Sequence, residues 1–255
     1  MTPPATKFAA ARRFGIEYVR HYHRLDLTIP DEKFDQPVLF VANHGFGGLF
    51  DLNALATLAA FDEMQLARPI TTLTHQMAWT LKLGHLLEPM GLQPASRASA
   101  QAAFEAGHHV AVVPGGDADA FKSWSDRNRI VFSGRRGFAR LAMELGVPIV
   151  PIVTAGAGES LVVISDGSRV ARALKLDKLL RLKCFPVSVS VPWGLNVGAV
   201  GLLPYLPLPT KLSTTVLNPM NPHPAESSDE FGARVETRMQ ETLTTMTRDR
   251  TPLLG

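Results

Sequence analysis

The chain alternates short apolar runs with segments whose apolar residues recur at helical spacing. Three continuous apolar runs with β-branched residues predict buried strands: 37–42, 109–113 and 147–153. Helical spacing predicts four helices: 7–24, a segment from Asp51 to residue 61, 98–106 and 136–145. Asp51 is suited to cap its helix, and Gly146 is suited to end the helix before it.

This alternation predicts an α/β fold. We expect a single domain over residues 1–255, with a mixed, mostly parallel sheet flanked by helices. Within it, residues 1–30 are expected to form an N-terminal helical segment, and residues 228–247 a closing surface helix. Residues 169–215 are rich in Pro and Gly toward their end and predict an extension that contacts a membrane or an acyl chain.

Composition narrows the class of protein. Hydrophobic residues make up 45% of the chain and charged residues 19%, a balance typical of folded proteins. The longest uncharged window, 184–210, is interrupted by five prolines, so no transmembrane helix is expected. The N-terminal residues lack the apolar core of a secretory signal, and the single cysteine, Cys184, excludes an intramolecular disulfide. These features predict a cytoplasmic protein.

The net charge of +3 and the pI near 9.2 favour anionic partners. Residues 169–183 carry six bases and one acid, and an uncharged Pro-rich run with Trp193 and Tyr205 follows. We therefore expect peripheral contact with the cytoplasmic face of an anionic membrane, although a solvated basic helix is the plainer alternative. A nucleic-acid partner is not expected, because no zinc-ligand spacing, basic aromatic motif or basic tail is present.

A histidine and an aspartate flank a glycine-rich loop in the stretch NHGFGGLFD. His44 follows a predicted strand and Asp51 begins the next helix, the region where α/β sheets tend to hold ligands. A neutral imidazole can take a proton from an alcohol, and a nearby carboxylate can orient it. The alternatives are a structural loop histidine and a dinucleotide site, but Phe50 occupies the position of the third glycine in the dinucleotide motif.

Two later stretches add candidate binding groups. Arg97 follows GLQPAS and offers a planar fork that suits phosphate. Gly115 and Gly116 follow a predicted strand, where backbone N–H groups can meet an oxyanion; a plain turn is the alternative. The histidine pairs 21/23 and 108/109 lack acidic or cysteine partners at ligand spacing, so no metal is expected.

Four motif blocks together resemble the glycerolipid acyltransferase family: NHGFGGLFD, GLQPASR, VPGGDADAF and GVPIVPIV, in the family's order. Six residues separate His44 from Asp51, where that family usually has four, and the third block lacks its usual charged pair. The Gly-Gly pair, Asp119 and the stretch RRGFARLA, which begins at Arg135, are similar to the mono- and diacylglycerol acyltransferase-like branch.

The resemblance implies a mechanism. His44 is expected to deprotonate an acceptor hydroxyl while Asp51 orients it, and the oxygen then attacks the thioester of acyl-CoA or acyl carrier protein. Substrate contacts are expected from Arg97, Gly115, Gly116, Asp119 and Arg135. No metal or redox cofactor and no covalent acyl-enzyme are implied.

The expected activity is O-acyl transfer in phospholipid biosynthesis. Because Arg97 is present, we expect a lysophosphatidate-type lysophospholipid as the acceptor; the variant third block makes a neutral mono- or diacylglycerol the alternative. A non-catalytic lipid-binding protein on the same scaffold is a further alternative. The chain has no Gly-x-Ser-x-Gly elbow and no P-loop motif, which disfavours a hydrolase or a P-loop enzyme.

Overall fold

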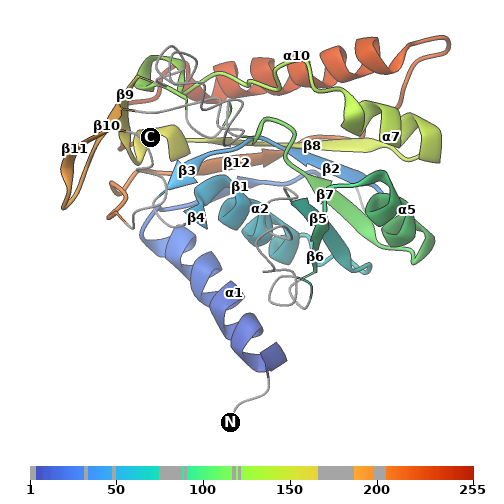
Figure 1. Ribbon diagram of the computed structural model, residues 1–255, viewed down its shortest axis with the longest axis horizontal. Helices are drawn as coiled ribbons and strands as arrows, with labels where there is room; N and C mark the ends of the chain where they lie inside the picture. The colour runs from blue at the N-terminus through green and yellow to red at the C-terminus, as the bar shows by residue number, and fades with distance from the viewer. Residues whose placement is uncertain are drawn as a thin grey trace.

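A mixed sheet of seven strands forms the centre of the molecule in the computed structural model (Figure 1). The structure describes all residues except 1–3, 32–33, 48–49, 75–87, 89–90, 117–118, 120–121, 166–186 and 198–204. The strands lie in the order β1 (Asp26–Thr28), β12 (Ser213–Val216), β8 (Ile149–Ala155), β2 (Leu39–Ala42), β7 (His109–Val112), β5 (Ile70–Thr74) and β6 (Leu92–Pro94). All neighbouring pairs are parallel except β12 with β8, so the predicted fold class is confirmed.

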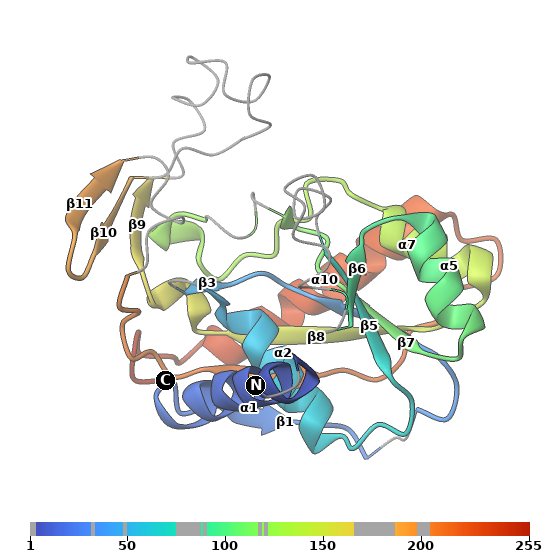
Figure 2. The same cartoon turned by 60° about the horizontal axis from the view of Figure 1, so that its bottom comes forward.

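Strand β2 shows why the predicted strands read as continuous apolar runs. All four of its residues are buried, because helices cover both faces of the sheet. Leu39 and Val41 pack on the face covered by α5 (Arg97–Glu105), α7 (Gly137–Leu145) and α10 (Ser228–Thr247). Phe40 points the other way, toward α2 (Leu52–Glu63), and α1 (Pro4–His21) packs against α2. Figures 1 and 2 show these two helical layers.

The helix ends follow local chemistry that the sequence already carries. The Asp51 side chain caps α2 by accepting hydrogen bonds from backbone N–H groups, as predicted. Gly146 ends α7 with a φ of 64°, the left-handed conformation that favours glycine. Ser227 and Glu230 form a capping box at the start of α10, which confirms the predicted closing helix at 228–247.

Two expected segments need correction. The N-terminal helix ends at His21, and residues 26–28 form β1 because they pair with β12 rather than continue the helix. Within the expected extension 169–215, Ser213–Thr215 belong to β12 of the central sheet. Residues 169–186, including Cys184, lie outside the described residues. Among the helices that are described, none is long and apolar enough to cross a membrane.

Two smaller sheets extend the main one. Strands β9 (Val162–Ser165), β10 (Val187–Ser190) and β11 (Gly194–Val197) form an antiparallel sheet at one end of the molecule (Figures 1 and 2). A hairpin joins β3 (Phe46–Gly47) to β4 (Phe50–Asp51). Two single turns of 3₁₀ helix, η2 (Trp124–Asp126) and η3 (Ala157–Glu159), lie in the loops.

Phe231 anchors α10 to the sheet and is fully buried, so its replacement tests the packing of that layer. We expect Phe231→Ala to lower the free energy of unfolding by about 3–5 kcal/mol, because a cavity replaces the ring. Phe14→Ala is the matched control, since Phe14 is 72% exposed and its loss should change stability by less than about 0.5 kcal/mol. Urea unfolding of both variants measures the difference, and equal losses would contradict the packing described.

Candidate active site

The site begins where β2 ends, and a side chain fixes that end. Asn43 donates a hydrogen bond from Nδ2 to the Thr154 carbonyl at 3.0 Å and accepts one from the Thr154 N–H at 2.9 Å. These two bonds continue the pairing of β2 with β8 by one residue. The Asn43 carbonyl also accepts a hydrogen bond from the Asn53 side chain at 3.1 Å. The backbone just before His44 is therefore held by both β8 and α2.

A short hairpin brings Asp51 back to His44. Phe46 pairs with Asp51 across β3 and β4, and the Leu52 N–H donates to the Gly45 carbonyl at 2.8 Å. Gly45 is packed so closely that an added Cβ would clash with Ala157 and Asn53. The hairpin explains how six intervening residues place the aspartate beside the histidine, where the family motif usually has four.

His44 and Asp51 form a hydrogen-bonded dyad, with 2.5 Å between Nδ1 of the ring and Oδ2 of the carboxylate. The other carboxylate oxygen accepts hydrogen bonds from the N–H groups of Gly45, Asn53 and Ala54. These donors include the first turn of α2, whose dipole also favours negative charge. Because Nδ1 donates to Asp51, Nε2 is the ring atom left to accept a proton.

Burial and charge act in opposite directions on this dyad. Burial by itself disfavours the imidazolium, but the hydrogen bond and charge of Asp51, with the charge of Asp119, outweigh it and raise the pKa of His44. Burial likewise opposes the ionised carboxylate, yet His44 and the backbone donors lower the pKa of Asp51. The carboxylate is thus ionised at neutral pH and strengthens the imidazole as a base.

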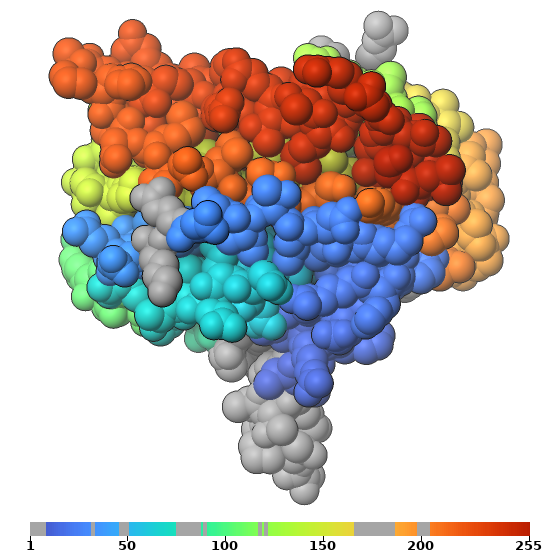
Figure 3. Space-filling view, turned by 180° about the vertical axis from the view of Figure 1, so that it is seen from behind, coloured from blue at the N-terminus to red at the C-terminus, as the bar shows by residue number. Residues whose placement is uncertain are grey.

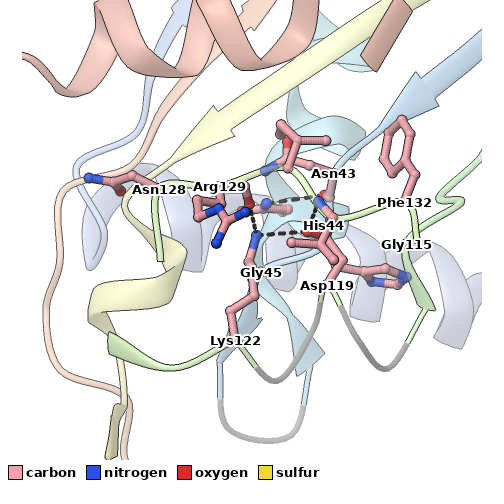
Figure 4. A network of polar contacts seen from close by, with 12 residues as sticks. Asn43, His44, Gly45, Gly115, Asp119, Lys122, Asn128, Arg129 and Phe132 are labelled. Carbon is pink, nitrogen blue, oxygen red and sulfur yellow. Dashed lines mark hydrogen bonds and ion pairs between the residues drawn. The ribbon is translucent and has the colours of Figure 1, made fainter. Parts of the chain in front are cut away.

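A second buried carboxylate holds the backbone of His44 (Figure 4). Asp119 is fully buried, and its Oδ2 accepts a hydrogen bond from the His44 N–H at 2.8 Å. Its Oδ1 accepts from the Val131 N–H at 3.0 Å and from the Lys122 ammonium at 2.8 Å. Lys122 also donates to the Arg129 carbonyl at 2.6 Å. These bonds occupy both Asp119 oxygens, so the carboxylate holds the backbone of His44 in place together with Lys122 and Val131.

A pocket opens beside the dyad at the carboxyl ends of β2 and β8. Its described lining combines polar groups of the dyad region, small residues of the β8–β9 turn and two apolar residues. The lining residues are Asn43, His44, Gly45, Asn53, Asp119, Lys122, Arg127, Thr154, Gly156, Ala157, Gly158, Leu161 and Val163. Arg127 lies over the Trp124 ring and forms no ion pair with any residue in the described part of the chain. The pocket is thus lined by both His44 and Arg127, a cation without an acidic partner among the described residues.

The glycine pair and Arg135 build the wall behind Asp119. Gly115 is buried so closely against Asp119 that an added Cβ would clash with it. Arg135 donates hydrogen bonds to the carbonyls of Pro114 and Gly115, and Gly116 has a φ of 57°. The structure brings these residues to the site through Asp119, but none of the three lines the described pocket.

Arg97 lies away from the pocket. It is the first residue of α5, its side chain is 68% exposed, and it pairs with Glu144 of α7 at 3.1 Å. It follows β6, a strand that the sequence did not predict and that ends at Pro94. The sequence could not show that β6 is an edge strand of the sheet. It lies five positions from β12 in the strand order.

Sequence reasoning missed Asn43, Lys122 and Thr154. Asn43 carried a signal, since it precedes His44 directly, but its partner Thr154 is 111 residues away. Lys122 carried a weaker one, since it follows Asp119 by three positions. No group of histidine, cysteine and acidic residues suited to a metal occurs among the residues that the structure describes.

Known proteins resemble this chain in fold and in sequence. The fold is similar to that of the 1-acyl-sn-glycerophosphate (LPA) acyltransferase PlsC from Thermotoga maritima, with a TM-score of 0.54 and 14% identity over 98% of this chain and 85% of that one. This likeness concerns the fold. The model of the diacylglycerol acyltransferase family matches residues 7–240, and the chain belongs to that family.

Two further proteins are similar to part of this chain in sequence. An uncharacterized protein of Mycobacterium tuberculosis is 31% identical over 178 residues, which cover 69% of this chain and 46% of that protein. A protein of Gallus gallus described as a DGAT1/2-independent enzyme synthesizing storage lipids is 25% identical over 158 residues, 62% of this chain and 41% of that protein. The chain thus matches less than half the length of these relatives.

The dyad makes a prediction about proton binding. The His44 ring should titrate with a midpoint above 6.5, and the midpoint should fall in Asp51→Asn, because the hydrogen bond and the charge of Asp51 then no longer oppose the effect of burial. The raised pKa stabilises the fold below pH 6.5, and this stabilisation is lost as the pH rises through the folded-state pKa. An NMR titration of the ring measures both midpoints, with Asp62→Asn as a surface control. An unchanged midpoint in Asp51→Asn would contradict the dyad.

The buried pair of Asp119 and Lys122 makes a prediction about stability. Asp119→Ala leaves an ammonium that is only 8% exposed without its partner, so it should lower the free energy of unfolding by about 3–5 kcal/mol. Asp62→Ala removes an exposed pair with Arg12 and should cost less than about 1 kcal/mol. Urea unfolding compares the two, and adding Lys122→Met should restore part of the loss in Asp119→Ala.

Proposed function

We propose that this protein is an O-acyltransferase that moves a fatty acyl group from a thioester to the hydroxyl of a glycerolipid. The observation that carries the proposal is the His44–Asp51 dyad, 2.5 Å between Nδ1 and Oδ2, at the rim of the pocket. The family supplies the class of reaction. The donor is proposed to be acyl-CoA or acyl carrier protein, both of which present the same thioester.

In this reaction His44 acts as a general base. Nε2 takes the proton of the acceptor hydroxyl as its oxygen attacks the thioester carbonyl, and Asp51 stabilises the imidazolium that forms. The thiolate of the donor leaves as the tetrahedral intermediate collapses, and it takes the proton from His44. Atoms and charge balance without a covalent acyl-enzyme. The chemistry needs no metal or redox cofactor.

Arg127 is the described group best suited to stabilise charge in the pocket. Its guanidinium has no acidic partner among the described residues, whereas the Lys122 charge is taken up by Asp119. A cation in such a pocket can stabilise the oxyanion of the intermediate or bind a phosphate of the donor. The expected roles of Gly115 and Gly116 as oxyanion donors stay predictions.

Two observations favour a neutral glyceride as the acceptor. Arg97, the residue expected to hold a lysophosphatidate head group, pairs with Glu144 outside the described pocket. The family and the Gallus gallus relative are described by diacylglycerol and storage-lipid synthesis. A lysophosphatidate-type acceptor, and with it a role in phospholipid biosynthesis, is the second candidate, and Arg127 is the observation that favours it.

Replacing His44 tests the mechanism. We expect His44→Ala to lower kcat by about 10²–10⁴-fold, because the general base is lost. His21→Ala is the matched control, since that side chain is 81% exposed and distant in the sequence. Thiol release from palmitoyl-CoA, measured with monoacylglycerol, diacylglycerol and lysophosphatidate, gives the rate and the acceptor in one assay.

Each outcome of the assay has a distinct meaning. Unchanged turnover in His44→Ala would refute the mechanism. Acceptor binding without thiol release in the unmodified protein would favour the non-catalytic lipid-binding alternative. Faster turnover with lysophosphatidate than with either neutral glyceride would reverse the preference for acceptor.

A further inference from the structure

In the small sheet of β9, β10 and β11, apolar side chains face outward and polar side chains face inward. A sheet with one face in water normally has the opposite arrangement. In β10 the polar Ser188 and Ser190 are buried, whereas Val189 is 43% exposed. Leu195, which lies directly opposite Val189 on β11, is 67% exposed. The apolar plate is the outward set of these side chains together with the adjoining exposed ones. It consists of Ile164, Val189, Val191, Leu195, Val197 and Leu206.

The composition of the plate excludes an ordinary solvated edge. Residues 187–197 contain no charged side chain, although exposed sheet edges in soluble proteins usually carry charges that prevent association. Of the two inward serines, Ser190 accepts a hydrogen bond from Asn196 at 3.0 Å. An exposed apolar surface of this kind marks a contact site rather than a random arrangement.

The plate lies one strand away from the active-site pocket. Val163 of β9 lines the pocket beside His44, and its neighbour Ile164 is 58% exposed. Successive residues of a strand point to opposite faces, so β9 separates the pocket from the plate. Figure 2 shows this sheet at one end of the molecule, away from α5 and α7, and Figure 3 shows its strands at the rim of the opposite view.

The charge of the adjacent chain identifies the kind of partner. Ser165 ends β9, Val187 begins β10, and the two residues lie opposite each other in the register. The sequence between them, residues 166–186, carries six bases and two acids. The described residues on either side of this basic sequence, Ser165 and Val187, therefore belong to the two strands that carry Ile164 and Val189 of the plate. An anionic surface attracts such a segment, whereas a second copy of the chain would bring a like charge against it.

We propose that the apolar plate is the surface on which this protein docks to an anionic lipid bilayer. The exposed side chains of the plate enter the interface, which sets the pocket beside the layer that holds the acceptor, and the positive charge of the sequence between β9 and β10 favours anionic head groups. The proposal deepens the proposed function by naming the membrane-facing surface of the same site. Docking itself does not depend on catalysis, so the two are tested separately.

A matched pair of leucines tests the plate. Leu195 lies on it and Leu254 lies near the C-terminus, and both are 67% exposed. Partition of the full chain is measured by sedimentation with vesicles of phosphatidylcholine mixed with phosphatidylglycerol, and with phosphatidylcholine alone. We expect Leu195→Gln to lower the partition coefficient on the anionic vesicles about tenfold, and Leu254→Gln to change it less than about twofold.

A second variant and two readouts keep the test decisive. Val197→Thr retains a β-branched side chain on the plate and should also weaken partition, while urea unfolding checks that both variants are folded. Equal partition of Leu195→Gln, Leu254→Gln and the unmodified protein would overturn the proposal. So would a plate-dependent shift from dimer to monomer by light scattering without any change in vesicle binding. Plate-dependent binding without acyl transfer would leave the docking surface intact and refute the proposed function alone.

Discussion

Two carboxylates hold His44, the half-buried Asp51 and the fully buried Asp119, and the geometry of the site depends on them. Asp51 accepts a hydrogen bond from the ring, and Asp119 accepts one from the backbone N–H. Each carboxylate has partners that stabilise its negative charge. Asp51 accepts hydrogen bonds from N–H groups at the start of α2, and Asp119 pairs with Lys122. A base fixed at both its ring and its backbone is oriented before any substrate arrives, which is the condition for efficient proton transfer.

The same constraint explains the packing around the dyad. Gly45 and Gly115 allow backbone to approach these carboxylates and their neighbours more closely than a Cβ would permit. Asn43 ties the end of β2 to β8, so the histidine stands on two parallel strands rather than on a free loop. The pocket then opens on the side of β9, and the outer face of the sheet of β9, β10 and β11 carries the apolar plate. The pocket and the apolar plate therefore lie on opposite faces of the same small sheet.

Much of the fold was predictable because it rests on local patterns. The strand at 37–42 reads as apolar throughout since both faces of β2 are covered, and Gly146 and Asp51 mark helix ends through their own backbone or side-chain chemistry. The short strands β1, β5 and β6 escaped detection. They are three to five residues long, and their pairing with partners distant in the sequence stabilises them more than any local preference does.

The sequence by itself indicated His44 as the candidate base and Asp51 as its partner, because the order of four short motifs and the position of His44 after a buried strand are one-dimensional signals. Only the tertiary structure decided how these two residues meet and what else holds the histidine. The hairpin between β3 and β4 brings Asp51 across six residues, Asp119 arrives from 75 residues away, and Arg97 is drawn to Glu144 instead of the pocket. Contacts of this kind depend on strand order and on loop closure, neither of which is written in the spacing of residues along the chain.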